Sequence, residues 1–159
     1  MGDIRVRRGR RKDSADFLRL VDALAKYEHL EPPTKSGRRR LLEDIFSKDR
    51  IRLLVAVKKK DLVGYALYFF SYSSFLAKPT LYIEDIFVLE SQRGRGVGLG
   101  LFKRCAKEAA KEDCGRMEWA VLNWNKSAMT FYERIGAKKL ADWSVYRLDG
   151  DGILRVSRG

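Results

Sequence analysis

Residues 92–98 read Gln92-Arg93-Gly94-Arg95-Gly96-Val97-Gly98 and separate an expected strand from an expected helix. Glycine lets the backbone adopt positive φ angles and approach a ligand closely. Successive N–H groups in such a turn form an anion-binding nest, and the positive end of the following helix strengthens it. The stretch therefore predicts a pyrophosphate site with Arg93 and Arg95 beside it, although a glycine-rich connection without a ligand remains an alternative.

Three better-known glycine motifs do not fit this turn. A dinucleotide-binding fingerprint needs Gly-x-Gly-x-x-Gly, and the last position here is Leu99 or Leu101, depending on where the motif starts. A phosphate-binding Walker loop needs Gly-Lys-Ser/Thr, which is absent. The RNA-recognition submotif needs aromatic residues after its Arg-Gly start, where this chain has Arg95 and Val97.

Hydrophobic periodicity on both sides of the turn predicts a mixed α/β sheet in one domain over residues 1–159. Pro32-Pro33 ends the first helical region, and Gly136 suits the C-cap of the last helix. The tail beyond Gly150 is left undecided. We expect strands at 4–7, 51–57, 62–72, 80–88, 116–122 and 137–148, and helices at 13–28, 41–46, 98–113 and 126–135.

The net charge of +12 is unevenly distributed. Residues 13–34 and 61–92 each carry a net charge of −3, whereas the rest of the chain is basic. A nucleic-acid-binding module driven by charge has no need of such acidic segments. That module stays an alternative, but we do not expect nucleic acid as a partner, and a basic surface also suits a polyanionic cofactor.

The sequence lacks the usual signals for membrane insertion, secretion and zinc binding. No stretch approaches the ~18–20 apolar residues of a membrane span, and the N-terminus lacks the apolar run of a secretory signal. Two cysteines make no disulfide framework, and a single histidine makes a zinc site improbable. We therefore expect a cytoplasmic protein with no membrane association and no metal, and we interpret Cys105 as a core residue of a helix.

The stretch 93–98 resembles the Arg/Gln-x-x-Gly-x-Gly/Ala signature of the GNAT acetyltransferases. Three further segments resemble the spermidine/spermine (diamine) acetyltransferase branch, which includes the thialysine acetyltransferases. They are Leu24-Ala25-Lys26-Tyr27-Glu28, Tyr82-Ile83-Glu84-Asp85-Ile86-Phe87-Val88, and Trp124-Asn125 followed by Phe131-Tyr132. The resemblance runs from about Ile4 to Leu148 without large gaps.

The resemblance implies a GNAT fold, in which acetyl-CoA lies in a V-shaped opening between the strands at 80–88 and 116–122. It implies a homodimer with a small amine as substrate, and it assigns catalysis to Tyr132 and Glu84. The cofactor-binding residues it implies are Ile86, Phe87, Val88, Arg93, Gly94, Arg95, Gly96, Val97, Gly98, Leu99 and Asn125. The implied substrate-binding residues are Tyr27, Glu28, Glu84, Asp85, Glu118, Trp119 and Ala120.

Local geometry qualifies some of these roles. In a regular strand Glu84, with Tyr82, Ile86 and Val88, faces away from Asp85, Ile83 and Phe87, so the two carboxylates would not share a proton, unless a bulge intervenes. Asn125 is also a good helix N-cap, and Tyr132 follows two turns or roughly 10.5 Å along the same helix face. Plain structural roles remain alternatives: an ion pair at the sheet edge, an N-cap, a core tyrosine, and capping or packing for Tyr27 and Glu28.

The expected reaction is direct attack of an amine on the thioester. Glu84, directly or through water, would remove the ammonium proton, and Tyr132 would protonate the departing thiolate. A backbone N–H near Phe87–Val88 would stabilise the oxyanion. The substrate is a diamine or polyamine, or a thialysine- or lysine-like amino acid, because Tyr72-Ser73-Ser74-Phe75 offers only hydroxyls to a second ammonium. Alternatives are protein or aminoglycoside amines and an acyl-CoA-binding pseudoenzyme.

Overall fold

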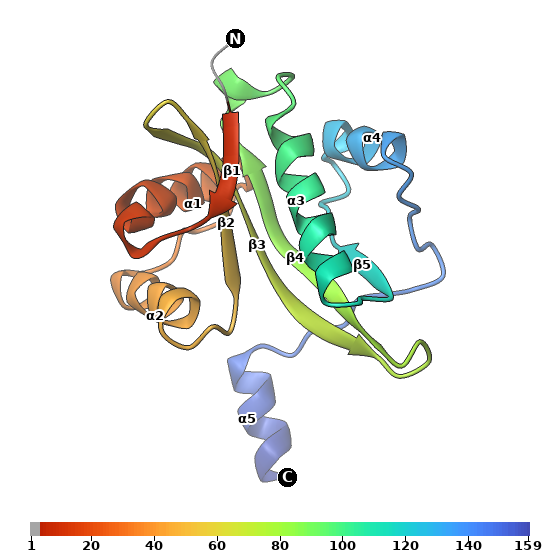
Figure 1. Cartoon of the computed structure of the whole chain (residues 1–159). Helices are drawn as coiled ribbons and strands as arrows, with labels where there is room; N and C mark the ends of the chain where they lie inside the picture. The colour runs from red at the N-terminus through yellow and green to blue at the C-terminus, as the bar shows by residue number, and fades with distance from the viewer. Residues whose placement is uncertain (1–3) are drawn as a thin grey trace. The chain divides into compact units, whose positions relative to one another are not determined.

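The computed structural model describes residues 4–159, which divide into two compact units (Figure 1). The first unit runs to Ala120 and the second from Val121 to Gly159. The strands of the first unit are β1 (Ile4–Arg8), β2 (Arg52–Lys58), β3 (Asp61–Ser73), β4 (Lys78–Val88) and β5 (Arg116–Trp119). Its helices are α1 (Ser14–Glu28), α2 (Lys35–Phe46) and α3 (Val97–Lys111), with short 3-10 turns at Arg11–Asp13 and Glu90–Gln92. The predicted single domain over residues 1–159 stays a prediction.

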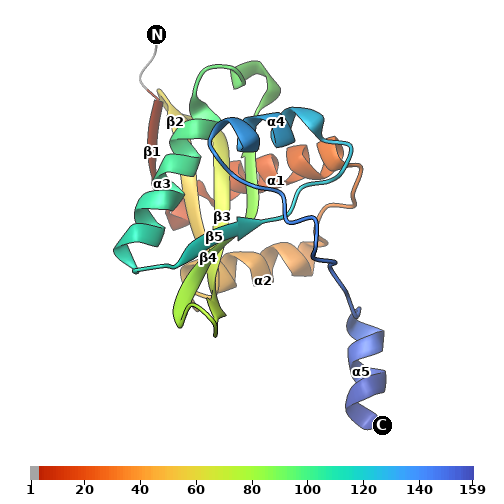
Figure 2. The same cartoon turned by 90° about the vertical axis from the view of Figure 1, so that its right-hand side faces the viewer.

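The five strands form one mixed sheet in the order β1-β2-β3-β4-β5. The first four pair antiparallel, and β4 pairs parallel with β5. Figure 2 shows α3 on one face of the sheet and α1 with α2 on the other. Both faces are therefore covered, which is why β2 and β3 carry long uninterrupted runs of buried residues. The predicted mixed α/β architecture is confirmed.

Each face of the sheet has its own hydrophobic core. On the α3 face, Leu101 and Cys105 are fully buried against Leu54 and Ala66, which confirms the interpretation of Cys105 as a core residue. On the other face, Phe17 of α1 packs edge-on against Tyr65 at a ring-centroid distance of 5.1 Å. The helical spacing of the apolar residues of α1 brings this stripe onto the sheet.

A β-bulge in β4 corrects the expected alternation of its side chains. Leu67 pairs with Asp85 but the next residue, Tyr68, pairs with Ile83, so Glu84 is an extra residue without an opposite partner. Because a bulge shifts the pleat by one residue, Ile83 before it and Ile86 after it pack on the same α3 face. The regular alternation does not hold along this strand, and the bulge that the sequence left open is present. Glu84 itself is exposed.

The second unit contains α4 (Lys126–Arg134) and α5 (Gly150–Arg158). As predicted, a helix follows Asn125, and Gly136 just beyond it has a positive φ of 91°. The strand predicted at 137–148 is wrong, because the described chain has no regular structure between α4 and α5. A strand needs a hydrogen-bonded neighbour, and no neighbouring strand pairs with this segment. Asp149 instead caps α5, where its Oδ1 accepts a hydrogen bond from Gly152 N at 2.7 Å.

The strand predicted at 116–122 is shorter than expected and ends at Trp119. Within residues 4–159, every helix is too short or too polar to cross a bilayer.

Candidate active site

The parallel pairing of β4 with β5 stops halfway along β4. Their register runs from Thr80 opposite Arg116 to Ile83 opposite Trp119, and ends there. β4 continues to Val88, still paired with β3 on its other side. Among the described residues, no strand pairs with the β5-side edge of Ile86, Phe87 and Val88. The predicted binding of the pantetheine arm of acetyl-CoA along β4 requires such an edge, because the arm would pair with backbone groups that no other strand uses.

The glycine turn follows directly, between β4 and α3. Gly94 and Gly96 have φ angles of 70° and 79°, in the left-handed region that favours glycine. Gly96 is the residue before α3, no side chain caps the helix there, and a Cβ on Gly96 would meet no atom within 4 Å. The first N–H groups of α3 have no partner within the helix and no side-chain cap at Gly96, as an anion site requires.

The rest of the turn is anchored to the sheet. Val97 is buried in the core of the α3 face, and a Cβ on Gly98 would lie 3.8 Å from Val88 Cγ2. Leu99, in the first turn of α3, is half-buried. The pyrophosphate site predicted at residues 93–99 thus has the backbone geometry of an anion site, with Arg95 exposed beside it.

Arg93 contacts the end of β4 and the end of α1, and its predicted role beside a phosphate stays a prediction. Its Nε donates to Val88 O at 3.0 Å, and its guanidinium lies over the rings of Tyr27 at 4.5 Å and Phe87 at 5.7 Å. Arg93 therefore joins the end of α1 to the end of β4 through cation–π contacts. The structure brings Tyr27 and Phe87 together, with ring centroids 6.5 Å apart.

Asp85 is the most strongly perturbed carboxyl group beside the free edge of β4. Burial, and then the charge of Glu84, raise the pKa of Asp85 to about 6. The hydroxyl of Tyr65 donates to Asp85 Oδ2 at 3.2 Å, which lowers this pKa, and the charge of Glu28 raises it further. Burial outweighs the hydrogen bond, so the carboxyl exchanges its proton close to neutral pH.

Glu28 ends α1 close to Asp85, and burial raises the pKa of the Glu28 carboxyl. His29 is the C-cap of α1, in the left-handed conformation with φ of 58°. The alternative that Tyr27 or Glu28 caps the helix is therefore wrong. The charges of Glu84 and Glu28 both raise the pKa of Asp85, so these two carboxylates lie near that of Asp85. Glu28, Glu84 and Asp85 are called the carboxylate cluster below. Three carboxylates there favour a cationic ligand.

Sequence analysis missed Tyr65. It is fully buried between Phe17 and Phe87, and its hydroxyl meets Asp85. The available signal was a tyrosine in the run Leu62–Leu67 of otherwise apolar residues, because a buried phenol requires a polar partner. That partner could not be identified without the pairing register of β3 with β4.

The expected substrate residues of β5 are divided between the two faces. Glu118 pairs with Tyr82 in the register and forms an ion pair with Arg116 at 3.1 Å. Burial, and then the charges of Glu84 and Glu118, raise the pKa of Tyr82. Trp119 instead packs edge-on against Phe102 of α3, with ring centroids 5.0 Å apart. Ala120 follows the strand and is exposed.

Asn125 and Tyr132 belong to the second unit. Asn125 Oδ1 accepts a hydrogen bond from Ala128 N at 3.3 Å, which confirms that Asn125 is the N-cap of α4. Tyr132 lies on α4 with its ring 5.5 Å from that of Phe131. The predicted roles of Asn125 and Tyr132 toward a ligand stay predictions.

The first unit thus combines three features on one chain segment. A free strand edge leads into an anion-binding turn, and carboxylates adjoin the strand at its bulge. The arrangement suits an elongated ligand with a phosphate end and a cationic co-ligand. Within residues 4–159, no group of three or more His, Cys, Asp or Glu side chains has an arrangement that could hold a metal ion.

Comparison with known proteins agrees with this geometry. Residues 17–137 match the model of the acetyltransferase (GNAT) family. The chain is 33% identical to a thialysine N-epsilon-acetyltransferase of Bos taurus over 169 residues, covering 99% of both chains. It is 44% identical over 103 residues to an L-ornithine N5-acetyltransferase of Arabidopsis thaliana, covering 64% of this chain and 45% of that protein.

Solved structures share the fold. An integron cassette protein of V. cholerae has a TM-score of 0.81 at 24% identity and covers 98% of both chains. An aminoglycoside N-acetyltransferase solved in complex with CoA has a TM-score of 0.80 at 18% identity, covering 94% of this chain and 97% of that one. The fold predicted from the sequence is confirmed.

Proposed function

The chain belongs to the acetyltransferase (GNAT) family, and on that premise we propose that it acetylates a primary amine of a small cationic substrate. It is an acetyl-CoA-dependent N-acetyltransferase. The observation that carries the substrate class is the carboxylate cluster of Glu28, Glu84 and Asp85 beside the free edge of β4. In a chain of net charge +12, these carboxylates provide a local site for an ammonium group.

The residues of the glycine turn fit a bound CoA. The open space around Gly96 and its positive φ leave the backbone accessible, and the N–H groups at the start of α3 can donate to a pyrophosphate. The free edge of Ile86–Val88 can pair with an amide-bearing arm. Acetyl-CoA would supply the thioester that the amine attacks.

Proton transfer is assigned to the carboxylates of β4 and to Tyr132. The substrate ammonium must lose a proton before it can attack, and Glu84, exposed at the bulge, takes that proton directly or through water. Asp85 lies beside it and holds its own proton up to about pH 6. A backbone N–H near Phe87–Val88 stabilises the oxyanion, and Tyr132 protonates the departing thiolate.

The relatives suggest which amine is acetylated. Two of them are a thialysine N-epsilon-acetyltransferase and an L-ornithine N5-acetyltransferase, and thialysine and ornithine are both amino acids whose amine ends a short side chain. We propose a substrate of this kind or a short diamine. Glu28 would bind the second positive charge, because it is the member of the cluster that lies on α1 rather than on β4.

We also propose a homodimer. β5 is an outer strand of the sheet among the described residues. Trp143, Val145 and Tyr146 have exposed fractions of 78%, 88% and 92% in the single chain. Large apolar side chains of this kind are typically buried at obligate homodimer interfaces. Light scattering at micromolar concentration should give twice the chain mass of 18.4 kDa. The cytoplasmic location stays a prediction.

The experiment that tests the function measures CoA release and identifies the acetylated product by mass spectrometry. The panel contains thialysine, ornithine, lysine, putrescine, spermidine, an aminoglycoside and a lysine-containing peptide. The proposal expects the highest kcat/KM with a small amino acid or diamine. A clear preference for the aminoglycoside or the peptide would contradict it, and acetyl-CoA binding without turnover of any amine would indicate a pseudoenzyme.

A further inference from the structure

Arg116, the first residue of β5, lies on the face of the sheet that carries Asp85. The side chains of Met117 and Trp119 pack against the hydrophobic core on the α3 face. Because successive side chains of a strand alternate between the two faces, Arg116 points to the opposite face. Asp85 is on that face as well, since it accepts a hydrogen bond from Tyr65, a residue of the second core.

The register of β4 with β5 places Arg116 within reach of the proposed amine site. Arg116 is opposite Thr80, and Glu84 follows four residues later on β4. At ~3.3 Å per residue, roughly 13 Å along the strand separates these two levels. Glu118, opposite Tyr82, lies between them. Burial, and then the charges of Glu84 and Glu118, raise the pKa of Tyr82, so both carboxylates lie near this ring.

The guanidinium of Arg116 is held through one of its three nitrogens. Its Nε donates to Thr80 Oγ1 at 3.3 Å and lies 3.1 Å from Glu118 Oε1, and Thr80 is buried. Arg7 and Arg38 instead direct both of their Nη groups to a single carboxylate each. Within residues 4–159, the Nη groups of Arg116 make no hydrogen bond or ion pair. These N–H donors are therefore available to a ligand.

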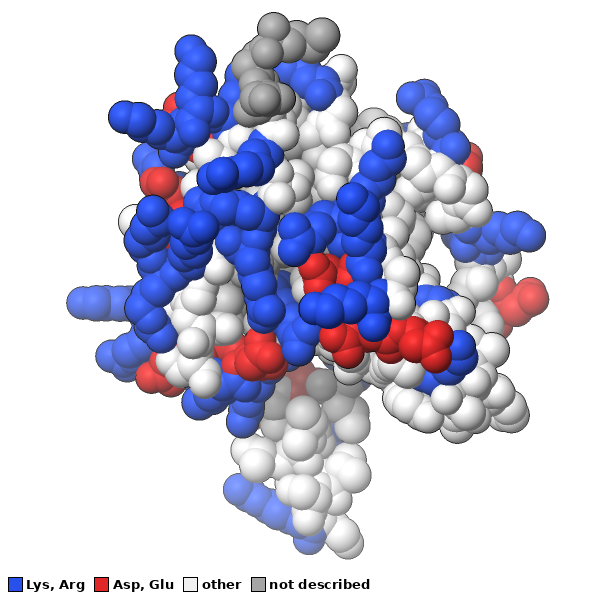
Figure 3. All heavy atoms as spheres, in the orientation of Figure 1, with Lys and Arg blue, Asp and Glu red and all other residues white. Residues whose placement is uncertain are grey.

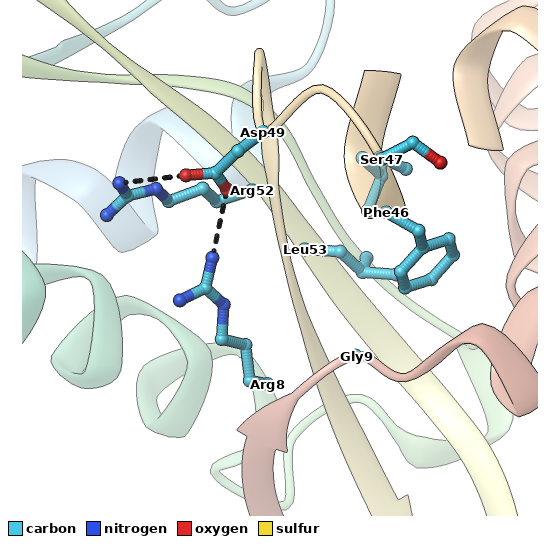
Figure 4. Close-up of a pocket in the computed structure, with 8 residues that line it drawn as sticks. Arg8, Gly9, Phe46, Ser47, Asp49, Arg52 and Leu53 are labelled. Atoms are coloured by element: carbon cyan, nitrogen blue, oxygen red, sulfur yellow. Dashed lines mark hydrogen bonds and ion pairs between the residues drawn. The ribbon is translucent and has the colours of Figure 1, made fainter. Parts of the chain in front are cut away.

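The arginines of β1 and β2 lie away from this site. Figure 3 shows many lysine and arginine side chains over the face that carries β1, and β1 and β5 are at opposite edges of the sheet. Arg8 and Arg52 share the carboxylate of Asp49 (Figure 4), and Arg52 pairs with Tyr68 of the α3-face core. β1 is three strands from β4, or roughly 14 Å at ~4.8 Å per strand, a distance at which exposed charges are largely screened. A substrate carboxylate beside β4 therefore needs a local cation such as Arg116.

Amino acids and diamines differ at the end remote from the reacting amine. Ornithine carries a carboxylate there, whereas putrescine, its decarboxylated counterpart, carries none. With carbon–carbon bonds of about 1.5 Å, extended ornithine places its carboxylate roughly 6–7 Å from its side-chain nitrogen. One charge-assisted hydrogen bond of about 2.8 Å at each end brings this span to roughly 12 Å. That length is comparable with the separation of Glu84 from Arg116 along the strands.

On the premise of the proposed amine acetylation, we propose that Arg116 is a specificity-determining residue that binds the carboxylate of an amino-acid substrate through its Nη groups. Thr80 and Glu118 orient the guanidinium through Nε. The planar guanidinium can bind a carboxylate with two parallel hydrogen bonds. A diamine lacks this carboxylate and gains nothing from the guanidinium. The enzyme therefore prefers ornithine or a similar amino acid to the corresponding diamine.

The test compares each amino acid with the diamine that lacks only its carboxylate. Steady-state kinetics at saturating acetyl-CoA give kcat/KM for ornithine and putrescine, and for lysine and cadaverine. The parent enzyme should favour the amino acid of at least one pair by about tenfold or more. Arg116→Gln should lower kcat/KM for that amino acid at least about tenfold, mainly through KM, and leave the value for its diamine unchanged or higher.

Arg104→Gln is the matched control. Arg104 is an arginine of α3 that forms an ion pair with Glu108 at 2.8 Å, and its side chain is 36% exposed, compared with 44% for Arg116. This variant should keep the preference of the parent, and thermal melts verify that both variants fold. Equal kcat/KM for amino acid and diamine in the parent, or an equal loss for both in Arg116→Gln, would overturn the role of Arg116 while acetylation of small amines stands. Turnover of none of the four amines would overturn the proposed function itself, and this inference with it.

Discussion

The hydroxyl of Tyr65 lies 3.2 Å from the carboxylate of Asp85, and this contact links the buried face of the sheet to the proposed amine site. The hydrogen bond favours the ionised carboxylate, but burial and the neighbouring carboxylates favour the protonated form and prevail. The pKa of Asp85 is therefore about 6 in the folded protein, compared with 3.8 for an ordinary aspartate.

This raised pKa predicts a pH-dependent gain from Asp85→Asn. The unfolded chain loses the Asp85 proton at lower pH than the folded one, so the ionised carboxylate costs the parent roughly 3 kcal/mol of stability at pH 7. The cost disappears toward pH 3, where both states are protonated. Thermal melts should show Asp85→Asn more stable than the parent by roughly 6–12 °C at pH 7 and equal to it near pH 3. A pH-independent difference would contradict the raised pKa.

Gly96→Val should weaken acetyl-CoA binding at least about tenfold while the fold survives. The substitution puts a β-branched side chain at φ of 79° and into the open space before α3. Gly100→Ala is the matched control, because a Cβ there makes an ordinary contact with Val6 Cγ2 at 3.5 Å. Calorimetry should show a loss only for Gly96→Val; equal affinities for both variants would remove the turn from the cofactor site.

Tyr132→Phe removes only a hydroxyl group. If Tyr132 is the acid that protonates the thiolate, kcat should fall by roughly 10²-fold or more, with little change in the KM for the amine. Steady-state kinetics with the best amine of the panel measure this, and Phe131→Leu controls for the neighbouring ring. A kcat within about twofold of the parent, with chemistry shown to be rate-limiting, would leave Tyr132 a packing residue.

Glu28→Gln should raise the KM for a diamine more than the KM for a monoamine of equal length. The substitution keeps the shape of the side chain and removes the partner proposed for the second ammonium. Glu31→Gln, at an exposed position just beyond α1, is the matched control. Equal changes in KM for the two amines would argue against Glu28 as a substrate residue.

Most of the first unit could be predicted from the sequence, because its signals are local. The apolar periodicity of α1 and the uninterrupted apolar runs of β2 and β3 define these elements, and the glycines mark the turn before α3. The segment 137–148 was mispredicted as a strand, because strand formation depends on a partner and not on composition alone.

The geometry at Glu84 could not be predicted, because a bulge belongs to a pair of strands rather than to one. The residues opposite it, Leu67 and Tyr68, give no sign of the extra residue in β4. A reader of the sequence who does not know of the bulge cannot derive which face of the sheet carries the Asp85 side chain, or that Asp85 contacts Tyr65. Glu28, Glu84 and Asp85 were identified from the sequence, but the arrangement of Glu84 and Asp85 became known only from the pairing register of β3 with β4.

The most direct measurement of the central claim is the pH–rate profile of Glu84→Gln between pH 7 and 10. If Glu84 removes the ammonium proton, the variant's kcat should be far below that of the parent at pH 7. The deficit should shrink as the pH rises and more of the substrate is already deprotonated. A deficit of constant size across this range would contradict the role of Glu84 as the base.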